Sequence, residues 1–284
     1  MLCPAVTAAQ SGAFLQARYL ALQDRLSHNA FHQPVYLESS ETEDELKGDI
    51  YAVTEQPFET VRQAMQRMDN WCEILILHLN VKNCRVISST TAQFLIVSIG
   101  KKHDEPLDKA FPVEFAFQVV TTNESYLRIR LHADAGPLGT KNYQIACEAV
   151  PLAAGQTFIH LAYSYDYGLT ARLAMKGYLN TVGLGKVGFS IAELRSDGEP
   201  VFIGGVRGVV ERNTMRYFLA IESYLAAPQS EQLELRLHNW FAATERYRRQ
   251  LHEIDETEYL EMKRKEVQRQ NTSDTKAQTE PAKK

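Results

Sequence analysis

The chain has 284 residues, 44% of them apolar, and its 31 Lys and Arg residues stand against 35 Asp and Glu residues, a net charge of −4. This length suits one large domain or two small ones with a buried core, and the apolar content excludes wholesale disorder. There is no basic excess to hold phosphates and no apolar run of the ~20 residues that a membrane-spanning helix needs. We therefore expect a soluble protein with neither a nucleic-acid partner nor an integral membrane segment.

The four cysteines are too few for a disulfide scaffold and lack the paired spacing of zinc sites, so we expect no metal and no other cofactor. Cys72 and Cys84 are the two that lie close in sequence. In an oxidising compartment they can form a disulfide, which would stabilise the fold by about 3 kcal/mol in the chain-entropy model. Two reduced cysteines in the core fit the sequence equally well. His78 with either of them makes a metal-site fragment, but no third ligand lies within reach in the sequence.

The two ends of the chain differ from the rest. The first ten residues contain the small-residue pattern Val6-Thr7-Ala8 of a signal-peptidase site, but no basic segment precedes it. A remnant of an export signal and an ordinary terminus both fit, so a periplasmic or secreted location is as compatible as a cytoplasmic one. Residues 268–284 carry no large apolar side chain, which predicts a disordered tail.

The N-terminal part indicates one helix and a connector. Residues 12–28 have apolar side chains near helical spacing, and a polar, acidic stretch follows from Glu38 to Glu45. We take residues 1–46 as an N-terminal extension with a short helix.

The next segment indicates a strand and then a helix. Residues 47–55 alternate as a strand does. From Phe58 to Leu79, seven apolar residues follow at steps of three and four, which predicts a helix. Pro57 suits the start of that helix, and Asp69-Asn70 can break it in two.

A change of period then predicts an antiparallel meander. Six short segments rich in β-branched and aromatic residues are separated by turn residues, and consecutive strands with short loops pair antiparallel. The expected strands are Arg85–Ser88, Gln93–Lys101, Val113–Thr122, Tyr126–Asp134, Tyr143–Leu152 and Thr157–Tyr167.

After the meander the helical period returns. It covers the segments 169–182 and 218–225, with an extended piece at 186–195 between them. Residues 229–267 read as one long amphipathic helix with a mixed-charge outer face. A solvated helix is one interpretation, and a dimerisation seam that makes a homo-oligomer through residues 230–267 is the other.

These elements resemble a known family. The residues that carry the resemblance are Gly48-Asp49-Ile50-Tyr51-Ala52 opening a strand, Gln56-Pro57-Phe58 entering a helix, Trp71-Cys72-Glu73 near its end, and the meander of residues 85–167. With these features the chain resembles the START-like superfamily, also called the SRPBCC or Bet v 1-like group, in a bacterial-type form.

The resemblance implies an α+β helix-grip fold, a curved antiparallel β-sheet wrapped around a helix, here with extra N- and C-terminal helices. It covers about residues 47–225, so we place the domain at 47–228. It also implies a cavity between sheet and helix and the family's general activity, the binding of lipids, sterols or polyketides. Members usually have one long helix after the last strand, whereas here Gly183–Gly188 and Phe202–Gly208 interrupt that region. The sequence therefore does not identify the gripping helix.

Gly183–Gly188 matches the letters of a dinucleotide-binding loop. Such a loop needs a strand before it and a helix after it, so that a helix N-terminus meets the pyrophosphate. Here the expected order is helix before and strand after. We interpret the segment as a turn.

Alternation on two strands supplies the candidate binding residues. Arg128, Arg130 and His132 share one face of their strand, opposite Leu127, Ile129 and Leu131. Either the cations are solvated and the apolar face lines the cavity, or the cations line it and hold an acidic head group. On the last strand His160 and Ser164 share a face opposite a tyrosine stripe, which can offer hydroxyls to a ligand. The candidate lining residues are Phe115, Phe117, Arg128, Arg130, His132, His160, Tyr163, Tyr165 and Tyr167.

Three functions remain open at this point. The first is non-catalytic binding or carriage of a hydrophobic or amphipathic, lipid-like small molecule. The second is a cyclase- or aromatase-like enzyme in the same cavity, with His132, His160, Tyr163 or Tyr165 as an acid or base. The third is a protein-interaction module that uses residues 230–267. No motif assigns a catalytic residue.

Overall fold

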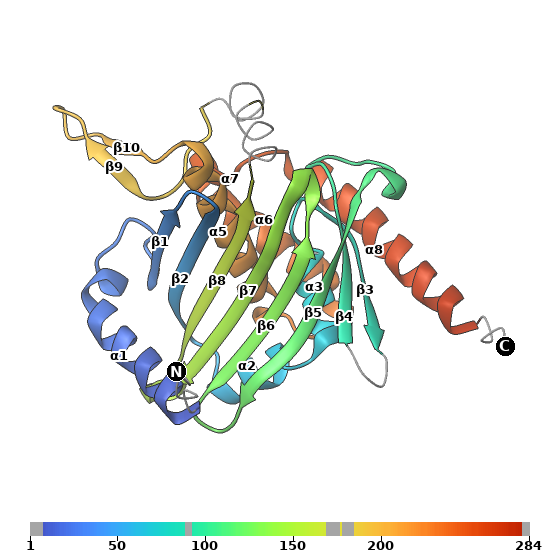
Figure 1. Cartoon of the computed structure of the whole chain (residues 1–284), viewed down its shortest axis with the longest axis horizontal. Coiled ribbons are helices and arrows are strands. Elements are labelled where there is room, and N and C mark those ends of the chain that lie inside the picture. Colours follow the sequence, from blue (N-terminus) through green and yellow to red (C-terminus); the bar gives the residue numbers. More distant parts are fainter. Residues whose placement is uncertain (1–7, 89–92, 169–176, 178–184, 280–284) are drawn as a thin grey trace.

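The computed structural model describes residues 8–88, 93–168, 177 and 185–279. Within these residues an eight-stranded antiparallel sheet has the order β1-β2-β8-β7-β6-β5-β4-β3 (Figure 1). Its strands are β1 (Val35–Glu41), β2 (Glu45–Thr54), β3 (Val81–Ser88), β4 (Gln93–Ile99), β5 (Phe111–Thr122), β6 (Leu127–Ala135), β7 (Thr140–Pro151) and β8 (Thr157–Tyr167). The α+β fold with an antiparallel sheet and a long helix against it is confirmed.

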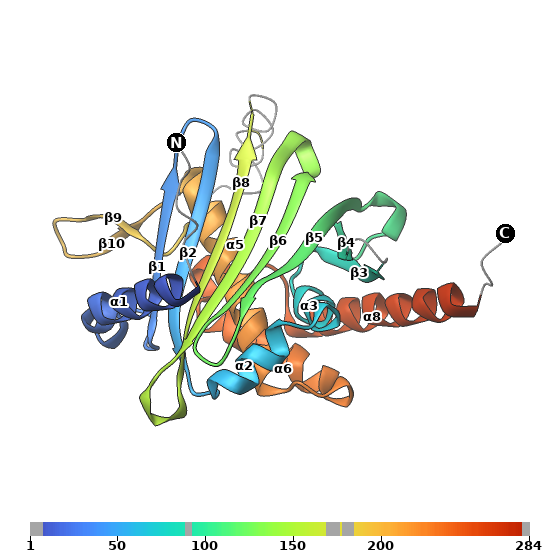
Figure 2. The same cartoon turned by 60° about the horizontal axis from the view of Figure 1, so that its bottom comes forward.

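Helices cover this sheet from both sides (Figures 1 and 2). In chain order they are α1 (Ala8–Ser27), α2 (Phe58–Met65), α3 (Met68–Leu75), α5 (Gly205–Ala226), α6 (Leu233–Glu245), α7 (Arg248–Leu251) and α8 (Glu256–Thr279). A small hairpin of β9 (Ile191–Leu194) and β10 (Pro200–Phe202) precedes α5. None of the described helices is long and apolar enough to span a membrane.

Helix α5 is the long helix on the inner face, which we define as the face of the sheet that α2, α3 and α5 cover. It lies across β1, β2 and β8. At Gly48 of β2 the helix approaches so closely that a Cβ would meet the side chain of Thr214. Side chains of the inner face form the main core, for example Leu127, Ile129 and Leu131, which are fully buried.

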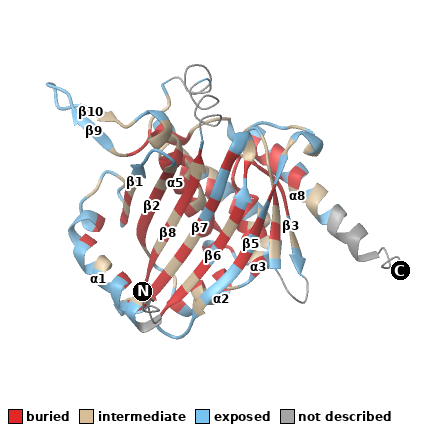
Figure 3. Ribbon diagram, in the orientation of Figure 1, coloured by how far each residue is buried: buried red, intermediate tan, exposed pale blue. Residues whose placement is uncertain are grey.

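Helix α1 packs on the opposite face, which we call the outer face. Its Leu15, Leu22 and Leu26 form a second, smaller core with Tyr51 and Phe158 of the sheet. Much of the remaining surface of α1 from Gln10 onward is exposed to solvent, for example at Phe14 and Leu20, and Figure 3 shows these parts of the ribbon pale blue. The sheet is therefore covered on both faces at its β1–β2–β8 side.

The expected connector from Glu38 to Glu45 is wrong, because residues 35–41 form β1. This edge strand pairs with β2 along its length, with Leu37 opposite Ile50. Val35 and Leu37 point into the core, whereas the strand's second half is polar and partly exposed. The sheet therefore begins before residue 47, inside the segment taken as an N-terminal extension.

The single helix expected over residues 229–267 is also wrong. The chain forms a 3₁₀ turn at Ser230–Gln232, then α6 and α7, and it becomes extended at His252 before α8 begins. The apolar stripe that suggested a dimer seam is buried in the chain's own core, with Leu237 and Trp240 at most 1% exposed. These side chains therefore pack within the chain itself.

Helix α8 continues to Thr279, so residues 268–279 are helical and not a disordered tail. Two contacts hold this part of the helix: the Gln270 Oε1 accepts from the Cys84 N–H at 2.8 Å, and Arg269 donates to the Glu105 carbonyl at 3.3 Å. Residues 280–284 lie outside the described part.

The helix expected from Phe58 to Leu79 is two helices. The break falls at Gln66-Arg67, where Arg67 has extended backbone, and not at Asp69-Asn70. A disulfide joins Cys72 on α3 to Cys84 on β3. The expected helix at 169–182 lies outside the described residues apart from Gly177.

Gly188 of the glycine-rich segment Gly183–Gly188 packs closely against α5. Of this motif Gly183 and Leu184 lie outside the described residues. A Cβ on Gly188 would collide with the Glu211 carboxylate, which accepts hydrogen bonds from the N–H groups of Phe189 and Ser190. The glycine allows this close approach of the loop to α5.

Candidate functional site

Six rings from five parts of the chain meet between the inner face and α5. Tyr143 of β7 lies 5.0 Å from Tyr165 and 6.2 Å from Tyr163 of β8, and Tyr163 lies 5.3 Å from Tyr217 of α5, measured between ring centroids. Phe115 of β5 and His78 join at the two ends of this chain of contacts. We call these six residues the inner ring cluster: His78, Phe115, Tyr143, Tyr163, Tyr165 and Tyr217.

The tyrosine hydroxyls of this cluster differ in their hydrogen bonding. Tyr143 shares a 2.8 Å hydrogen bond with the hydroxyl of Thr140. The hydroxyls of Tyr163, Tyr165 and Tyr217 have no hydrogen-bond partner among the described residues, although Tyr163 and Tyr165 are at most 5% exposed. Burial raises the pKa of all three phenols well above the usual value, so they are neutral near pH 7.

His78 also has an imidazole nitrogen atom without a hydrogen-bond partner in the described structure. It lies in the turn between α3 and β3, is 2% exposed, and stacks on the Tyr217 ring at 4.7 Å. Its Nδ1 accepts from the Asn80 N–H at 3.1 Å, and its Nε2 has no partner in the described structure. Burial and the charges of Arg216 and Lys263 hold the pKa of His78 well below its usual value. The imidazole is therefore neutral, and its Nε2 carries an N–H that can donate.

A cation-rich cluster, the Glu253 cluster, lies beside His78. The Glu253 carboxylate binds Lys102 at 2.5 Å, Lys186 at 2.6 Å and Arg216 at 2.8 Å. Burial raises the pKa of Glu253, but Arg216 and Lys102 outweigh it and hold the pKa at about 2. Burial and Arg216 lower the pKa of Lys102 to about 8, against the opposing effect of Glu253.

The sequence candidates fall on both faces of the sheet. Phe115, Phe117, Tyr163, Tyr165 and Tyr167 are buried on the inner face, as the alternation of β5 and β8 predicts. The hydroxyl of Tyr167 donates to Glu41 at the sheet edge at 3.0 Å, outside the ring cluster.

Arg128, Arg130, His132 and His160 point to the outer face, so the prediction that they line the same cavity as the tyrosines is wrong. Side chains on neighbouring positions of a strand point to opposite faces. Of the two alternatives for the cations, the structure places the Leu/Ile side toward the covering helix. Arg130 donates to Gln118 at 3.1 Å, and His132 contacts the exposed Asp134 at 2.9 Å.

His160 lies between two carboxylates on the outer face. Its Nε2 is 2.8 Å from Asp49 Oδ1 and its Nδ1 is 3.0 Å from Glu148 Oε2, and its ring stacks on Tyr51 at 4.3 Å. Burial lowers the pKa of His160, but the two carboxylates outweigh it and raise the pKa overall. Because both nitrogens are engaged, this imidazole is poorly placed to act as an acid or base on a ligand.

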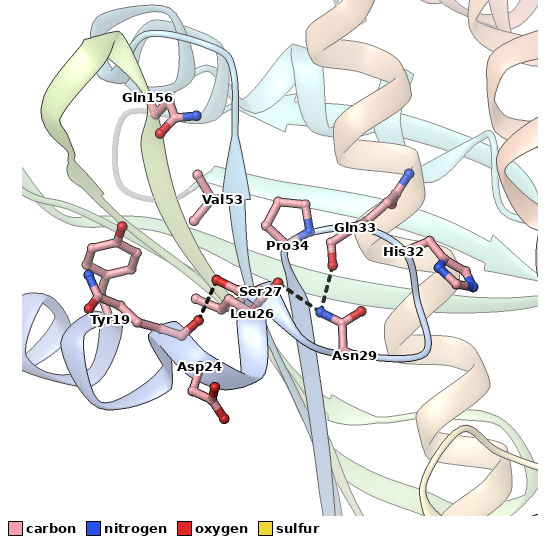
Figure 4. A pocket seen from close by; sticks show the side chains of 11 residues that line it. Tyr19, Asp24, Leu26, Ser27, Asn29, His32, Gln33, Pro34, Val53 and Gln156 are labelled. Carbon is pink, nitrogen blue, oxygen red and sulfur yellow. Dashed lines mark hydrogen bonds between the residues drawn. The ribbon is translucent and has the colours of Figure 1, made fainter.

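Open grooves flank α1 and α6. Figure 4 shows one of about 790 Å³ between α1 and the start of β1, where the Asn29 amide donates to the carbonyls of Leu26 and Gln33 at 2.9 Å. A neighbouring groove of about 680 Å³ shares Gln33, Pro34 and Val53 with it and reaches Glu222 of α5, whose pKa burial raises to about 7. A third, of about 530 Å³, lies beside the disulfide. The sequence candidates lie outside all three linings.

Several site residues escaped the sequence analysis. Tyr143 was inside a predicted strand but was not singled out, although its alternation with Ile145 was visible. Tyr217 carried no signal, since it sits beside the apolar stripe of a helix. His78 was considered only as a fragment of a metal site with Cys72 or Cys84 and not as a neighbour of the tyrosines. No three His, Cys, Asp or Glu side chains of the described residues come together as a metal site.

No protein-family model and no curated protein sequence matches the chain. Solved structures do match. They include norcoclaurine synthase from Thalictrum flavum (12% identity, 51% of this chain and 90% of that one, TM-score 0.36) and human StAR-related lipid transfer protein 5 (12%, 61% and 89%, 0.32). A START superfamily protein from Mycobacterium smegmatis is a third (11%, 49% and 92%, 0.33). At these identities the likeness concerns the fold alone. The structural neighbours of the chain are START-like and Bet v 1-like proteins, the group that its sequence features resemble.

Proposed function

We propose that the protein binds an amphipathic small molecule between the inner face of the sheet and α5, without transforming it. The aromatic faces of the inner ring cluster form the apolar contact surface for the body of the ligand. The hydroxyls of Tyr163, Tyr165 and Tyr217 and the Nε2–H of His78 are the polar groups that orient it.

The observation that supports this proposal is a set of polar atoms in the inner ring cluster without a partner among the described residues: the buried Nε2 of His78 and the hydroxyls of Tyr163, Tyr165 and Tyr217. Buried hydroxyls and ring nitrogens are almost always hydrogen-bonded, and each one left unmade costs about 1–3 kcal/mol. The buried Nε2 of His78 carries this cost, and the hydroxyls of Tyr163 and Tyr165 gain no hydrogen bond from the described protein, although Phe would fill the same space. A ligand that accepts and donates there would recover that free energy.

The chemistry favours binding over catalysis. The three phenols are neutral near pH 7, and the Nδ1 of His78 is occupied by a backbone N–H. The cluster thus presents hydrogen-bond donors and polarisable rings but lacks, within the described part of the chain, a positioned base.

A fluorescent apolar probe tests the site. N-phenyl-1-naphthylamine should bind with 1:1 saturation and a blue-shifted emission. Ala133 lies on the inner face in register with Tyr143, and it is 2% exposed. If the space beside it accepts a ligand, Ala133→Leu fills that space, leaves the free energy of unfolding nearly unchanged and weakens probe binding at least about tenfold.

The same variant distinguishes a filled core. If the protein's own side chains occupy the space, Ala133→Leu overpacks it and destabilises the fold by about 1–3 kcal/mol. Ala146→Leu, on the outer face beside Arg130, is the matched control and should change neither quantity. Overpacking by Ala133→Leu, or absence of saturable probe binding to the wild type, would overturn the proposal.

A second comparison tests the hydroxyls. Tyr163→Phe and Tyr165→Phe should leave the free energy of unfolding of the ligand-free protein unchanged or raise it, because each removes a group without a protein partner. Tyr143→Phe removes a made hydrogen bond to Thr140 and should lower it by about 1 kcal/mol. Equal losses in all three variants would show that Tyr163 and Tyr165 are satisfied structurally.

A further inference from the structure

The groove of about 680 Å³ beside α5 and α6 is open because its helical walls are built from short side chains. Ser223 and Ala226 of α5 and Ala242 and Ala243 of α6 line it, next to the start of β1 and the end of β2. Larger residues at these positions would fill the space between the two helices. We call this space the α5–α6 groove.

Glu222 of α5 brings a carboxyl group into the α5–α6 groove. The residue is partly buried, and it has neither a hydrogen bond nor an ion pair with another residue that the structure describes. The neighbouring Ser223 does not serve as a donor, because its hydroxyl donates to the Leu219 carbonyl at 2.7 Å. A carboxylate partly removed from water is costly when nothing pairs with it, and burial accordingly raises the pKa of Glu222 to about 7.

Arg246 of α6 lines the same groove but does not form an ion pair with Glu222. With its amide oxygen toward α6, Gln33 accepts hydrogen bonds from the Arg246 guanidinium. Arg246 lowers the pKa of Glu222, but burial outweighs it. The guanidinium thus has a hydrogen-bond acceptor in the protein, whereas the carboxylate has no donor among the described residues.

The charge around Glu222 favours a cation. The groove of Figure 4 adjoins the α5–α6 groove at Gln33, Pro34 and Val53 and extends the space toward α1. The described linings of the two grooves contain three carboxyl groups and one guanidinium: Asp24, Glu55, Glu222 and Arg246. A positively charged ligand complements this surface, and an anion would be repelled from it.

We propose that the α5–α6 groove is a second binding site, which takes an aliphatic amine whose ammonium group pairs with the Glu222 carboxylate while its chain lies against Val53 and the alanines of the two helices. Ammonium groups bind carboxylates through charge-assisted hydrogen bonds, and the chain leaves water on contact with the apolar side chains. The site is separate from the inner ring cluster, so this inference goes beyond the proposed function and stands without it.

Three probes of equal chain length test the charge of the ligand. At pH 8, n-hexylamine is a cation, 1-hexanol is neutral and hexanoate is an anion. In isothermal titration calorimetry on the full-length protein, n-hexylamine should bind with 1:1 saturation. It should bind at least about tenfold more tightly than 1-hexanol, and hexanoate should bind more weakly than either.

Substitutions locate the amine. Glu222→Gln keeps the shape of the side chain and removes its charge, so it should weaken n-hexylamine binding at least about tenfold and change 1-hexanol binding less than about twofold. Because Glu222 has no partner in the described protein, this variant should have an unchanged or higher Tm. Glu261→Gln, at an exposed position of α8, is the matched control and should change neither binding nor Tm. Ala242→Leu narrows the groove at an exposed position and should weaken binding of both n-hexylamine and 1-hexanol.

Several results would overturn this inference. Equal binding of n-hexylamine and 1-hexanol, or tighter binding of hexanoate, would show that the groove does not select a cation. If Glu222→Gln weakens both probes alike or neither, the carboxylate makes no specific contact with the ammonium group. A lower Tm of Glu222→Gln with unchanged n-hexylamine binding would assign Glu222 a structural role, and unchanged binding in Ala242→Leu would place the amine elsewhere. Failure of N-phenyl-1-naphthylamine to bind would refute the proposed function and leave these expectations as they are.

Discussion

Glu266→Gln should be among the most damaging single-atom changes in this protein. Glu266 of α8 binds the Lys82 ammonium at 3.1 Å and the Lys263 ammonium at 2.7 Å, and all three side chains are fully buried. The ammonium groups also donate to backbone carbonyls: Lys82 to Leu79 and His103, Lys263 to His78 and Val81. These bonds tie α8 to β3 and to the turn before it.

The size of the destabilisation depends on the two ammonium charges that stay buried after the substitution. Glutamine keeps the shape of the side chain but removes the carboxylate charge that two buried ammonium groups share. Breaking a buried ion pair on one side costs about 3–5 kcal/mol, because the partner charge stays buried. Burial already lowers the pKa of Lys263 to about 8, against the pull of Glu266, so in the variant this lysine can shed its proton and limit the loss.

Urea unfolding followed by tryptophan fluorescence measures the loss, since Trp71 and Trp240 are both 1% exposed. At pH 7 we expect the free energy of unfolding to fall by about 3–5 kcal/mol. Glu261→Gln, at an exposed position of the same helix, should change it by less than about 0.5 kcal/mol. Adding Lys263→Met to Glu266→Gln should recover part of the loss by removing one stranded charge.

The difference in stability between wild type and Glu266→Gln should also depend on pH. As the pH rises through the pKa of Lys263, the ammonium that Glu266 neutralises disappears, so the gap between wild type and Glu266→Gln should narrow above about pH 8. A Glu266→Gln variant as stable as Glu261→Gln at pH 7 would refute this account of the cluster. A gap that widens at alkaline pH would refute the assigned charges.

Two further predictions concern other clusters. His160→Gln should lower the free energy of unfolding by about 1–3 kcal/mol, most strongly between about pH 4.5 and 6.5, in a urea titration repeated across pH. The raised pKa of His160 makes its contribution complete below about 6.5 and lost as the pH rises, while the lowered pKa values of Asp49 and Glu148 make theirs fade in acid; a loss of equal size at all pH values would contradict this. Reduction of the Cys72–Cys84 disulfide, which spans 12 residues, should cost about 3 kcal/mol in the same assay. The reductant should have no effect on the Cys72→Ala/Cys84→Ala variant, and a wild type that is equally insensitive to it would show that the disulfide does not stabilise the fold.

The alternation of apolar residues predicted most of the sheet because each strand from β5 to β8 has one face in the core. It correctly separated Tyr163 from His160 and Ile129 from Arg128. It failed for β1, since only Val35 and Leu37 of that edge strand are buried and its remaining residues are polar. Alternation also cannot tell which face of the sheet a helix will cover. The arginines and the tyrosines were therefore both predicted to line the cavity, although they lie on opposite faces.

The spacing of apolar residues also did not predict where the expected C-terminal helix is interrupted. Leu237, Trp240, Leu251 and Ile254 keep helical spacing, and the pattern is the same whether the helix is continuous or the chain turns at His252. The turn is fixed by tertiary contacts: Arg216 donates to the Leu251 carbonyl at 3.2 Å and to Glu253. Contacts between residues 35 or more positions apart do not affect the local spacing of apolar residues. The Glu253 cluster was not predicted for the same reason.

The backbone and the side chain of His78 differ in their hydrogen bonding, and that difference bears on the proposed function. The ammonium of Lys263 donates to the backbone carbonyl of His78 and to Glu266, so each of its charges and bonds is met by the protein. The side chain of the same histidine stacks on the Tyr217 ring and has an Nε2 without a hydrogen-bond partner among the described residues. A network that fixes the backbone of His78 restrains its imidazole, and a restrained donor loses little entropy when it meets an acceptor on a ligand. Holding such a donor in place is therefore a use for the buried charges of α8 beyond stability.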